Sequence, residues 1–327
     1  MRRRDFITMV GGTTVAWPLL ARAGEPSTSR LVGVLVNLAA GDTSGQTRVA
    51  AFRQALQQLG WIDGSKLRID VRWASDSGLA QKDAAELVAQ APAVILAATT
   101  PLVTALQHAT RSVPIVFVNV IDPVGSGMVA SLARPGGNIT GFIVFEYALA
   151  AKWLQLLKEI APNVTRTAVL RDPAVASGIG QFAAIQTVNA LDMELTAIDV
   201  RDADQIARDV ASFAQVPNGG LIVTANLFGA VHPDVIVAAA ERHKLPAVYS
   251  APYYVAAGGL ISYAHDVLED YRRAEGYVDR ILNGAKPADL PVQAPTKYEL
   301  AINLKAAKTI GLNPPASLLG RVDDVIE

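Results

Sequence analysis

Cysteine is absent from the 327-residue chain, which excludes disulfide bonds, thiolate catalysis, iron–sulfur clusters and thiolate zinc sites. Charged residues make up only 18% of the sequence, and the formal net charge is −1. No sustained basic stretch is present, and clustered Lys and Arg are what neutralise the phosphates of DNA and RNA. We therefore expect no nucleic-acid partner.

Two sequence motifs of common α/β activities are also missing. The phosphate-binding pattern G-x-x-x-x-G-K-[ST] does not occur, so we expect no ATPase in this chain. The pattern G-x-S-x-G is absent too, which argues against an α/β-hydrolase. The four histidines are isolated from one another, so their spacing indicates no metal site. We expect neither a metal ion nor another cofactor.

Long apolar runs are missing except near the N-terminus, and that segment has the pattern of an export signal. Arg2–Arg4 form a positive region, Phe6–Leu20 is a short apolar run, and Ala21–Ala23 is an A-x-A cleavage pattern before Gly24. Residues 1–23 are therefore predicted to be a signal peptide. The apolar run is too short to anchor the mature protein in a membrane.

The signal also suggests a compartment. An Arg pair followed by Asp5-Phe6-Ile7 resembles the twin-arginine signal, and the general export route remains open beside it. No Cys stands at the cleavage site, so lipid attachment is not expected. Removing residues 1–23 takes away four Arg and one Asp, which leaves 25 basic and 29 acidic residues, a net charge of −4. We expect a soluble mature protein in a bacterial periplasm.

The remaining residues show alternating strand and helix patterns. Apolar runs without period-two alternation are typical of parallel strands that are covered on both faces. Segments with helical spacing of apolar residues lie between them. The pattern predicts an α/β fold with doubly wound parallel sheets. The expected strands are 32–36, 93–97, 115–118, 168–170, 221–223 and 247–249, and the expected helices are 49–59, 79–90, 102–110, 182–191 and 235–243.

Two halves of the chain follow the same order of elements. Their corresponding strands are offset by 135, 127 and 132 residues, at Val32 and Thr167, Ala93 and Gly220, and Pro114 and Pro246. A nearly constant offset of this length suits two lobes of like topology rather than a solenoid.

The chain is expected to cross between the lobes three times, near residues 138–142, 258–263 and 294–303. The helix 267–283, which Gly284 and Pro287 would end, is then expected to pack on the first lobe. We assign residues 30–140 and 264–295 to the first lobe. Residues 141–263 and 296–327 form the second.

Short motifs follow one another along the chain at Thr99-Thr100-Pro101, 113–117, 122–125, 135–141, Gly258-Gly259-Leu260 and 302–308. In this order and spacing they resemble the ABC-transporter substrate-binding family of type I periplasmic binding proteins, in particular members that bind tryptophan or other amino acids. The resemblance extends over residues 31–312.

The resemblance implies two lobes joined by a hinge that close on a small solute. The solute would be an amino acid, an aromatic acid or another carboxylate, and an inner-membrane permease with an ATPase would receive it. A monomer is expected. The resemblance does not identify the solute.

Residues that follow the buried strands are the candidate ligand contacts, because ligands of open α/β sheets bind beyond the carboxyl ends of the strands. Thr99 and Thr100 stand before Pro101 at a helix start, where N–H groups and hydroxyls suit a carboxylate; capping of the helix alone is the alternative. Asp122 and Asp172 also stand before a proline just after a strand. Each would either cap a helix or pair with a ligand ammonium group.

Amide and aromatic residues complete the candidate set. Asn37, Asn119 and Asn226 follow strands and could bond across a closing cleft or merely stabilise turns. Similar proteins carry an Asp near the position of Asn226, so this chain leaves recognition of a ligand ammonium open. Aromatic walls suit an amphipathic solute. The further candidates are Thr43, Phe142, Tyr249 and Tyr253, with Tyr254 and Phe228 beside them.

Two other classes of protein remain to be weighed. An exported α/β enzyme acting on a small carboxylate would need a base and a nucleophile together, and Asp122, Asp172 and Tyr253 form no recognisable pair. A transcriptional regulator with the same lobes would begin with a DNA-binding helix-turn-helix where this chain has an export signal. We therefore favour a solute-binding protein without enzymatic activity.

Overall fold

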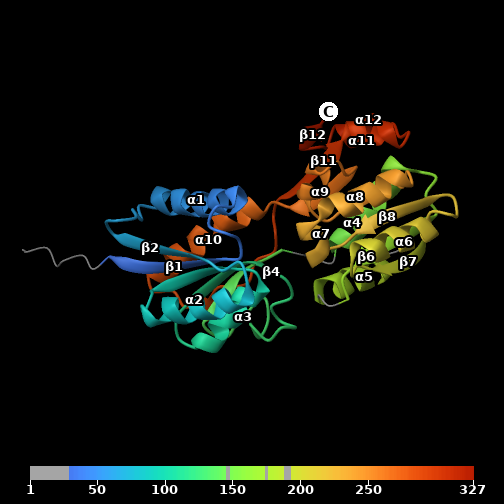
Figure 1. The fold of residues 1–327 in the computed structure, drawn as a ribbon. Coiled ribbons are helices and arrows are strands. Elements are labelled where there is room, and N and C mark those ends of the chain that lie inside the picture. Colours follow the sequence, from blue (N-terminus) through green and yellow to red (C-terminus); the bar gives the residue numbers. More distant parts are fainter. Residues whose placement is uncertain (1–28, 145–147, 174–175, 188–192) are drawn as a thin grey trace, which may run out of the picture.

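The computed structural model describes residues 29–144, 148–173, 176–187 and 193–327. The predicted signal peptide, residues 1–23, lies outside the described residues, as do residues 188–191 of one expected helix. Figure 1 shows two lobes, each built around its own sheet, joined by segments that cross between them. The predicted α/β class, with two mostly parallel sheets, is confirmed.

The first sheet has five parallel strands in the order β2-β1-β3-β4-β5. Helices connect successive strands from β1 to β4. The elements are β1 (Arg30–Val36), α1 (Thr43–Gln58), β2 (Leu67–Trp73), α2 (Ser77–Ala89), β3 (Val94–Ala98), α3 (Thr100–Ala109), β4 (Ile115–Val120) and β5 (Ile139–Ile143).

Both faces of this sheet are covered, which explains the apolar runs of its central strands. Val34 of β1 packs in a core with Phe52 of α1 and Tyr271 of α10 (Val267–Leu282). The next residue, Leu35, points to the opposite core, beside Leu87 of α2. Side chains on both faces of these strands are therefore removed from water, and the alternation of apolar and polar residues that marks a half-exposed strand is lost.

The second sheet has seven strands in the order β12-β11-β10-β9-β8-β6-β7. Its neighbours pair in parallel except β10 and β11, which are antiparallel. The elements are α4 (Ala148–Ile160), β6 (Arg166–Arg171), α5 (Ala176–Thr187), β7 (Glu194–Asp199), α6 (Ala203–Phe213), β8 (Gly219–Val223), α7 (Leu227–Val231), α8 (Pro233–Arg242), β9 (Ala247–Tyr249), α9 (Pro252–Ala256), β10 (Ile261–His265), β11 (Tyr298–Asn303), α11 (Leu304–Thr309), α12 (Ala316–Leu319) and β12 (Asp324–Ile326).

Helices also cover this sheet on both sides. Trp153 of α4 and Ile185 of α5 pack with Ile222 of β8 on one face. Ile206 of α6 and Ile236 of α8 form the core of the other. The strand order β7-β6-β8-β9-β10 repeats the order β2-β1-β3-β4-β5 of the first lobe, so the internal repeat predicted from the strand offsets is present.

The chain crosses between the lobes at the end of β5, at the end of β10 and in the segment before β11. The first crossing, which we expected near residues 138–142, lies later: β5 pairs with β4 through Ile139, Thr140, Gly141 and Ile143, and the chain leaves the first sheet after Ile143. β10 belongs to the second sheet, and α10 then packs against α1 and the first sheet, as the sequence predicted. The helix ends before Gly284, whose φ is +98°, followed by a 3₁₀ turn η1 (Pro287–Asp289).

The first and third crossings are paired with each other. The backbone N–H of Ile143 donates to the carbonyl of Gln293 at 3.0 Å, and the N–H of Gln293 donates to the carbonyl of Gly141 at 2.9 Å. Among the helices that the structure describes, none has the length and hydropathy to cross a membrane.

Candidate functional site

The carboxyl ends of the two parallel sheets face the crossings. The chain leaves the first sheet at the carboxyl end of β5 and the second sheet at the carboxyl end of β10. Residues that follow the parallel strands of either lobe therefore lie on the sides that meet at the waist in Figure 1. Open α/β sheets bind ligands at this edge. The sequence-predicted residues can therefore be examined lobe by lobe.

In the first lobe, the start of α3 lacks the side-chain cap that the sequence suggested. Thr99 occupies the N-cap position with Pro101 in the first turn, yet its hydroxyl makes no capping hydrogen bond in the described structure. The hydroxyl of Thr100 accepts from the N–H of Ile121 at 3.5 Å, which links α3 to the segment after β4. The positive end of the α3 dipole is thus not neutralised by a cap.

Backbone strain is concentrated at the same edge. Thr99, Asn119 and Asp122 have φ values of +68°, +58° and +45°, in the region that L residues adopt at a cost of about 1–3 kcal/mol each. Asp122 is exposed, and its Oδ1 accepts from the N–H of Gly125 at 2.8 Å. This carboxylate stabilises a turn and does not cap a helix as the sequence suggested, because the described residues between β4 and β5 contain no helix.

A close approach of the backbone requires glycine beside these residues. At Gly141 the φ is +153°, and a Cβ would lie 2.0 Å from the carbonyl oxygen of Phe117 in β4. The β4–β5 register shifts just beyond this contact, between Phe117 and Val120. Gly141 therefore permits the bend of β4 that presents Asn119.

Asn37 and Thr43, which follow β1, and Phe142, which lies within β5, have different surroundings. Asn37 is partly buried, and its Oδ1 has no hydrogen-bond partner among the described residues. Thr43 is exposed at the first turn of α1, whose cap is Asp42. Phe142 is not at the surface: it packs in the first core, with its ring centroid 5.0 Å from that of Tyr277 and the Arg273 guanidinium 4.9 Å from its ring centroid. Of the three residues, Phe142 lies in the core, away from the carboxyl edge of the first sheet.

In the second lobe, Asn226 is buried and bonds within its own lobe. Its Oδ1 accepts from the N–H of Gly229, and its amide nitrogen donates to the carbonyl of Thr224 at 2.8 Å and to the hydroxyl of Tyr254 at 3.1 Å. Asn226 is the cap of α7. The turn-stabilising interpretation therefore describes Asn226.

Three tyrosine rings, from the last residue of β9 and from α9, are packed together. Tyr249 and Tyr254 are buried and stack with centroids 4.8 Å apart, whereas Tyr253 packs against Tyr254 at 4.7 Å and is 39% exposed. Burial raises the pKa of both Tyr249 and Tyr254. Tyr253 is thus the ring that a ligand can reach, while Tyr249 supports it from the core.

One residue that sequence reasoning missed holds this edge in place. Gln181 of α5 is buried, and its Oε1 accepts from the N–H of Ala225 at 2.8 Å. The contact joins positions 44 residues apart, and no local pattern marks it. Asp172, at the end of β6, is buried near the ion pair of Arg171 and Asp199, whose atoms are 3.0 Å apart.

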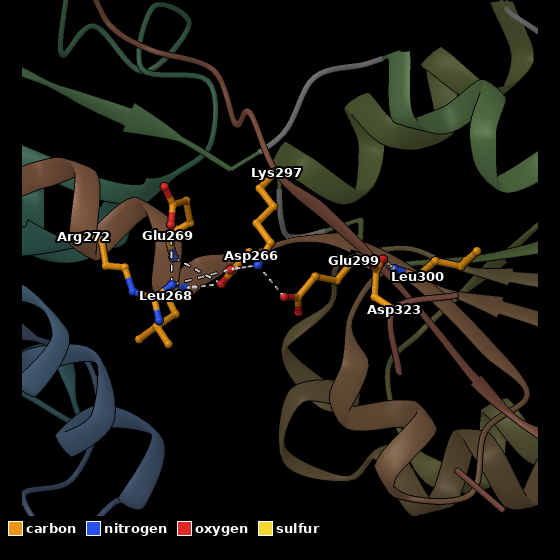
Figure 2. A network of polar contacts seen from close by, with 8 residues as sticks. All are labelled: Asp266, Leu268, Glu269, Arg272, Lys297, Glu299, Leu300 and Asp323. Atoms are coloured by element: carbon orange, nitrogen blue, oxygen red, sulfur yellow. Dashed lines mark hydrogen bonds and ion pairs between the residues drawn. The ribbon is translucent and has the colours of Figure 1, made fainter. Parts of the chain in front are cut away.

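A polar network connects the second and third crossings, as Figure 2 shows. Asp266 caps α10 by accepting from the N–H groups of Leu268 and Glu269, and its other oxygen lies 2.9 Å from the Lys297 amine. Lys297 also reaches Glu299 at 3.2 Å. Burial raises the pKa of Asp266, but the bonds from Lys297 and the two N–H groups outweigh it and lower the pKa.

A buried acid and imidazole lie beside this network. Nε2 of His265 and Oδ2 of Asp270 are 3.5 Å apart, and neither atom makes a hydrogen bond with another described residue. Burial lowers the pKa of His265 to about 4 and raises that of Asp270 to about 7. Both groups are therefore largely neutral in slightly acidic solution. No group of three or more His, Asp or Glu in the described parts of the chain could hold a metal ion.

The sequence and the fold both match known solute-binding proteins. A tyrosine-binding protein of Clostridioides difficile (strain R20291) is 26% identical over 80% of this chain and 75% of its own. A conserved domain protein of Vibrio cholerae is 26% identical with a TM-score of 0.79, covering 91% of this chain and 99% of that one. An ABC domain of Streptococcus pneumoniae in complex with L-Trp shares the fold, with a TM-score of 0.80 at 24% identity, covering 91% and 100%.

The family model for ABC transporter substrate binding proteins matches residues 32–326. This match spans both lobes and all three crossings. The chain therefore belongs to the ABC transporter substrate-binding protein family.

Proposed function

We propose that the protein captures a small organic carboxylate, with aromatic amino acids as the first candidates, between its two lobes and delivers it to an inner-membrane ABC permease. The observation that carries the proposal is that each lobe has an unsatisfied or exposed group just after a parallel strand, the uncapped start of α3 after β3 and the exposed Tyr253 after β9. A tyrosine-binding relative and an L-Trp complex among similar folds support this class of ligand.

The first lobe would hold the carboxylate group. A helix N-terminus attracts an anion through its N–H groups and dipole, and the α3 start has no side-chain cap in the described structure to compete for them. Thr99, Thr100 and Asn119 lie beside it with hydroxyl and amide groups. Asn37, Thr43 and Asp122 border the same edge and would contact the rest of the solute.

The second lobe would hold the aromatic or apolar part. Tyr253 offers an exposed ring face, and the buried Tyr254 and Tyr249 support it from behind. Asn226 and Tyr249 act by positioning this wall rather than by touching the solute. A ring packed against an aromatic wall gains about 0.5–1.5 kcal/mol beyond the area that it buries.

Binding would close the lobes about the crossings. We assign residues 30–143 and 266–295 to the first lobe and residues 148–265 and 296–327 to the second, because β5 (Ile139–Ile143) pairs in the first sheet and β10 (Ile261–His265) in the second. The boundaries expected from the sequence, after residues 140 and 263, therefore move to the ends of these two strands. A solute held between the lobes touches both only when they are closed, so ligand shifts the population toward the closed state. Export by residues 1–23 would place the mature, monomeric protein in the periplasm, where such a permease receives its solute.

Native mass spectrometry of the protein purified from the periplasm tests the proposal, because a co-purified solute adds its mass to that of the apo-protein. Thermal unfolding is then measured with L-tyrosine, L-tryptophan and L-phenylalanine. A ligand at about 100 times its Kd should add about 2.7 kcal/mol to the free energy of unfolding. No bound mass together with no stabilisation by any carboxylate would refute the proposal, and conversion of the ligand to a product would favour an enzyme.

A further inference from the structure

Two arginines stand at opposite ends of strand β6 in the second lobe, and the fold holds both in the same way. Arg166 begins the strand and Arg171 ends it. The Nε atom of each faces a carboxylate of the neighbouring edge strand β7, at 3.5 Å for Arg166 and Glu194 and at 3.0 Å for Arg171 and Asp199. One arrangement of arginine and acid therefore occurs twice on the same pair of strands.

Each guanidinium also lies over a phenylalanine ring. The central carbon of the Arg166 guanidinium is 4.6 Å from the ring centroid of Phe213, and that of Arg171 is 4.7 Å from the ring centroid of Phe182. A guanidinium over an aromatic face is attracted to the ring and loses conformational freedom there. Both arginines are thus held on an edge and on a face.

The outer nitrogen atoms of the two arginines have different surroundings. Nη1 of Arg166 donates to the carbonyl oxygens of Phe213 and Val216, at 3.5 Å and 3.2 Å. Arg171 bonds through Nε to Asp199, and neither of its Nη atoms donates to a residue that the structure describes. The fold therefore uses Arg166 as a link between backbone segments, whereas the Nη donors of Arg171 are left over.

The position of Arg171 makes these donors relevant to a solute. β6 is parallel to both of its neighbours, so its last residue lies at the carboxyl edge of the second sheet and Arg166 lies at the opposite edge. Ligands of open α/β sheets bind at the carboxyl edge. The side chain of Arg171 is 25% exposed, so a solute at this edge can reach its Nη atoms.

The charge around Arg171 indicates which group would bind there. The two Nη atoms of a guanidinium form a planar fork that matches the two oxygens of a carboxylate. Asp199 already balances the charge of Arg171 at 3.0 Å, so a singly charged carboxylate suits the fork better than a doubly charged phosphate. The contacts with Asp199 and Phe182 hold the fork in place without help from the solute.

We propose that Arg171 is a ligand-binding residue of the second lobe and that its guanidinium binds a carboxylate of the solute, with Asp199 and Phe182 as its positioning residues. The inference rests on the proposed function, in which the start of α3 binds one carboxylate in the first lobe. It narrows the ligand class to solutes with two carboxylates, one for each lobe.

Calorimetric titration with two matched pairs of probes tests the inference. L-phenylalanine is compared with 4-carboxy-L-phenylalanine, and pentanoate with glutarate, because the members of each pair differ by one carboxylate. The wild-type protein should bind the dicarboxylate of at least one pair about ten- to hundredfold more tightly, the scale of a hydrogen bond to a charged group. Arg171→Gln should abolish this preference, and Arg171→Lys, which keeps the charge but not the fork, should retain part of it.

Arg166→Gln is the matched control. It removes an arginine from the same strand with the same acid and ring contacts, but at the opposite edge of the sheet, so the preference for a dicarboxylate should not change. Its unfolding temperature should fall more than that of Arg171→Gln, because only Arg166 donates to backbone carbonyls. Arg171 and Asp199 are partly exposed, so Arg171→Gln should remain folded.

A second measurement locates the bound carboxylate. In NMR spectra of protein labelled with ¹⁵N-arginine, the Nε–H signals of Arg171 and Arg166 are identified by their loss in the two Gln variants. Addition of the dicarboxylate that binds more tightly, or of glutarate where neither does, should shift the Arg171 signal in a saturable way. The Arg166 signal should stay in place.

The outcomes separate the inference from the proposed function. A preference that survives Arg171→Gln, or equal affinity for both members of each pair, refutes the role of Arg171, and binding of L-phenylalanine would then leave the proposed function in place. Binding of glutarate that depends on Arg171, without binding of either aromatic amino acid, supports the inference and refutes aromatic amino acids as the solute. No binding of any probe and no shift of the Arg171 signal refutes the inference, and native mass spectrometry then decides the proposed function by itself.

Discussion

Replacing Asp270 by Asn should stabilise the protein above neutral pH. The carboxyl group is buried on α10, and the nearest imidazole, that of His265, lies 3.5 Å from it. Burial raises the pKa of Asp270 to about 7, and the same cause lowers that of His265 to about 4. Above pH 7 the folded protein therefore contains a buried carboxylate beside a neutral imidazole.

The magnitude follows from the two pKa values of Asp270. The folded chain binds this proton more tightly than the unfolded chain, for which the ordinary value is 3.8. The free energy of unfolding therefore falls by about 4 kcal/mol in total as the pH rises from about 4 to about 7, at 1.36 kcal/mol per pH unit. Above pH 7 it does not change further with this group. Orienting a buried amide costs about 1 kcal/mol, so Asp270→Asn should gain about 3 kcal/mol at pH 8 and nothing near pH 4.

Urea unfolding of both proteins at pH 4.5, 6 and 8 measures this difference. Burial lowers the pKa of His265 to about 4, so this imidazole is neutral at pH 6 and pH 8 and its titration contributes little to the comparison at those two pH values. Glu269→Gln is the matched control on the same helix, because Glu269 is partly exposed and pairs with Arg272 at 3.5 Å, and it should change stability by less than about 0.5 kcal/mol at each pH. A destabilised Asp270→Asn at pH 8, or a gain that is the same at all three pH values, would refute the reasoning.

Further predictions concern the site, the hinge and export. Thr100→Val should raise the Kd of a carboxylate ligand by about two- to tenfold in calorimetry while the unfolding temperature stays nearly constant; the reverse pattern would make Thr100 a structural residue. Gly229→Ala should lower the free energy of unfolding by about 1–3 kcal/mol, because its Cβ meets the Tyr254 hydroxyl at 1.9 Å, whereas Gly276→Ala, with open space around it, should be neutral or stabilising. Small-angle scattering should show a smaller radius of gyration with saturating ligand, and an unchanged radius would contradict lobe closure. N-terminal sequencing of the periplasmic protein should begin near Gly24, and a retained Met1 would overturn export.

The central strands were predictable because burial on both faces leaves a continuous apolar run. β9 (Ala247–Tyr249) matches its predicted range, and β1 and β4 differ from theirs only at the ends. The edge strands β2, β5, β7 and β12 were not predicted, nor were β10 and β11, which lie inside the second sheet. In β2, Arg68, Asp70 and Arg72 interrupt the apolar residues, since an edge strand is only partly covered and tolerates charge.

The location of the candidate site was predictable from topology, but the orientation of individual side chains was not. Tyr249 and Tyr253 are both aromatic residues that follow a strand, yet one lies in the core and the other at the surface. Asn226 is fixed by Tyr254, 28 residues away, and a single sequence gives no sign of that contact. Phe142 is held in the core by Tyr277 on a helix that returns from the other lobe.

The candidate contact residues of the two lobes are held in place by different physical means. The first lobe uses its backbone: an uncapped helix start and three residues with positive φ, which the surrounding structure must hold in place. The second lobe uses side chains, and Asn226, Tyr254 and Gly229 fix one exposed ring. In the proposed function, these contacts hold both edges without help from the solute, so binding energy would be left for closure of the lobes. A solute would drive that proposed closure only by as much as it binds the closed state more tightly than the open one.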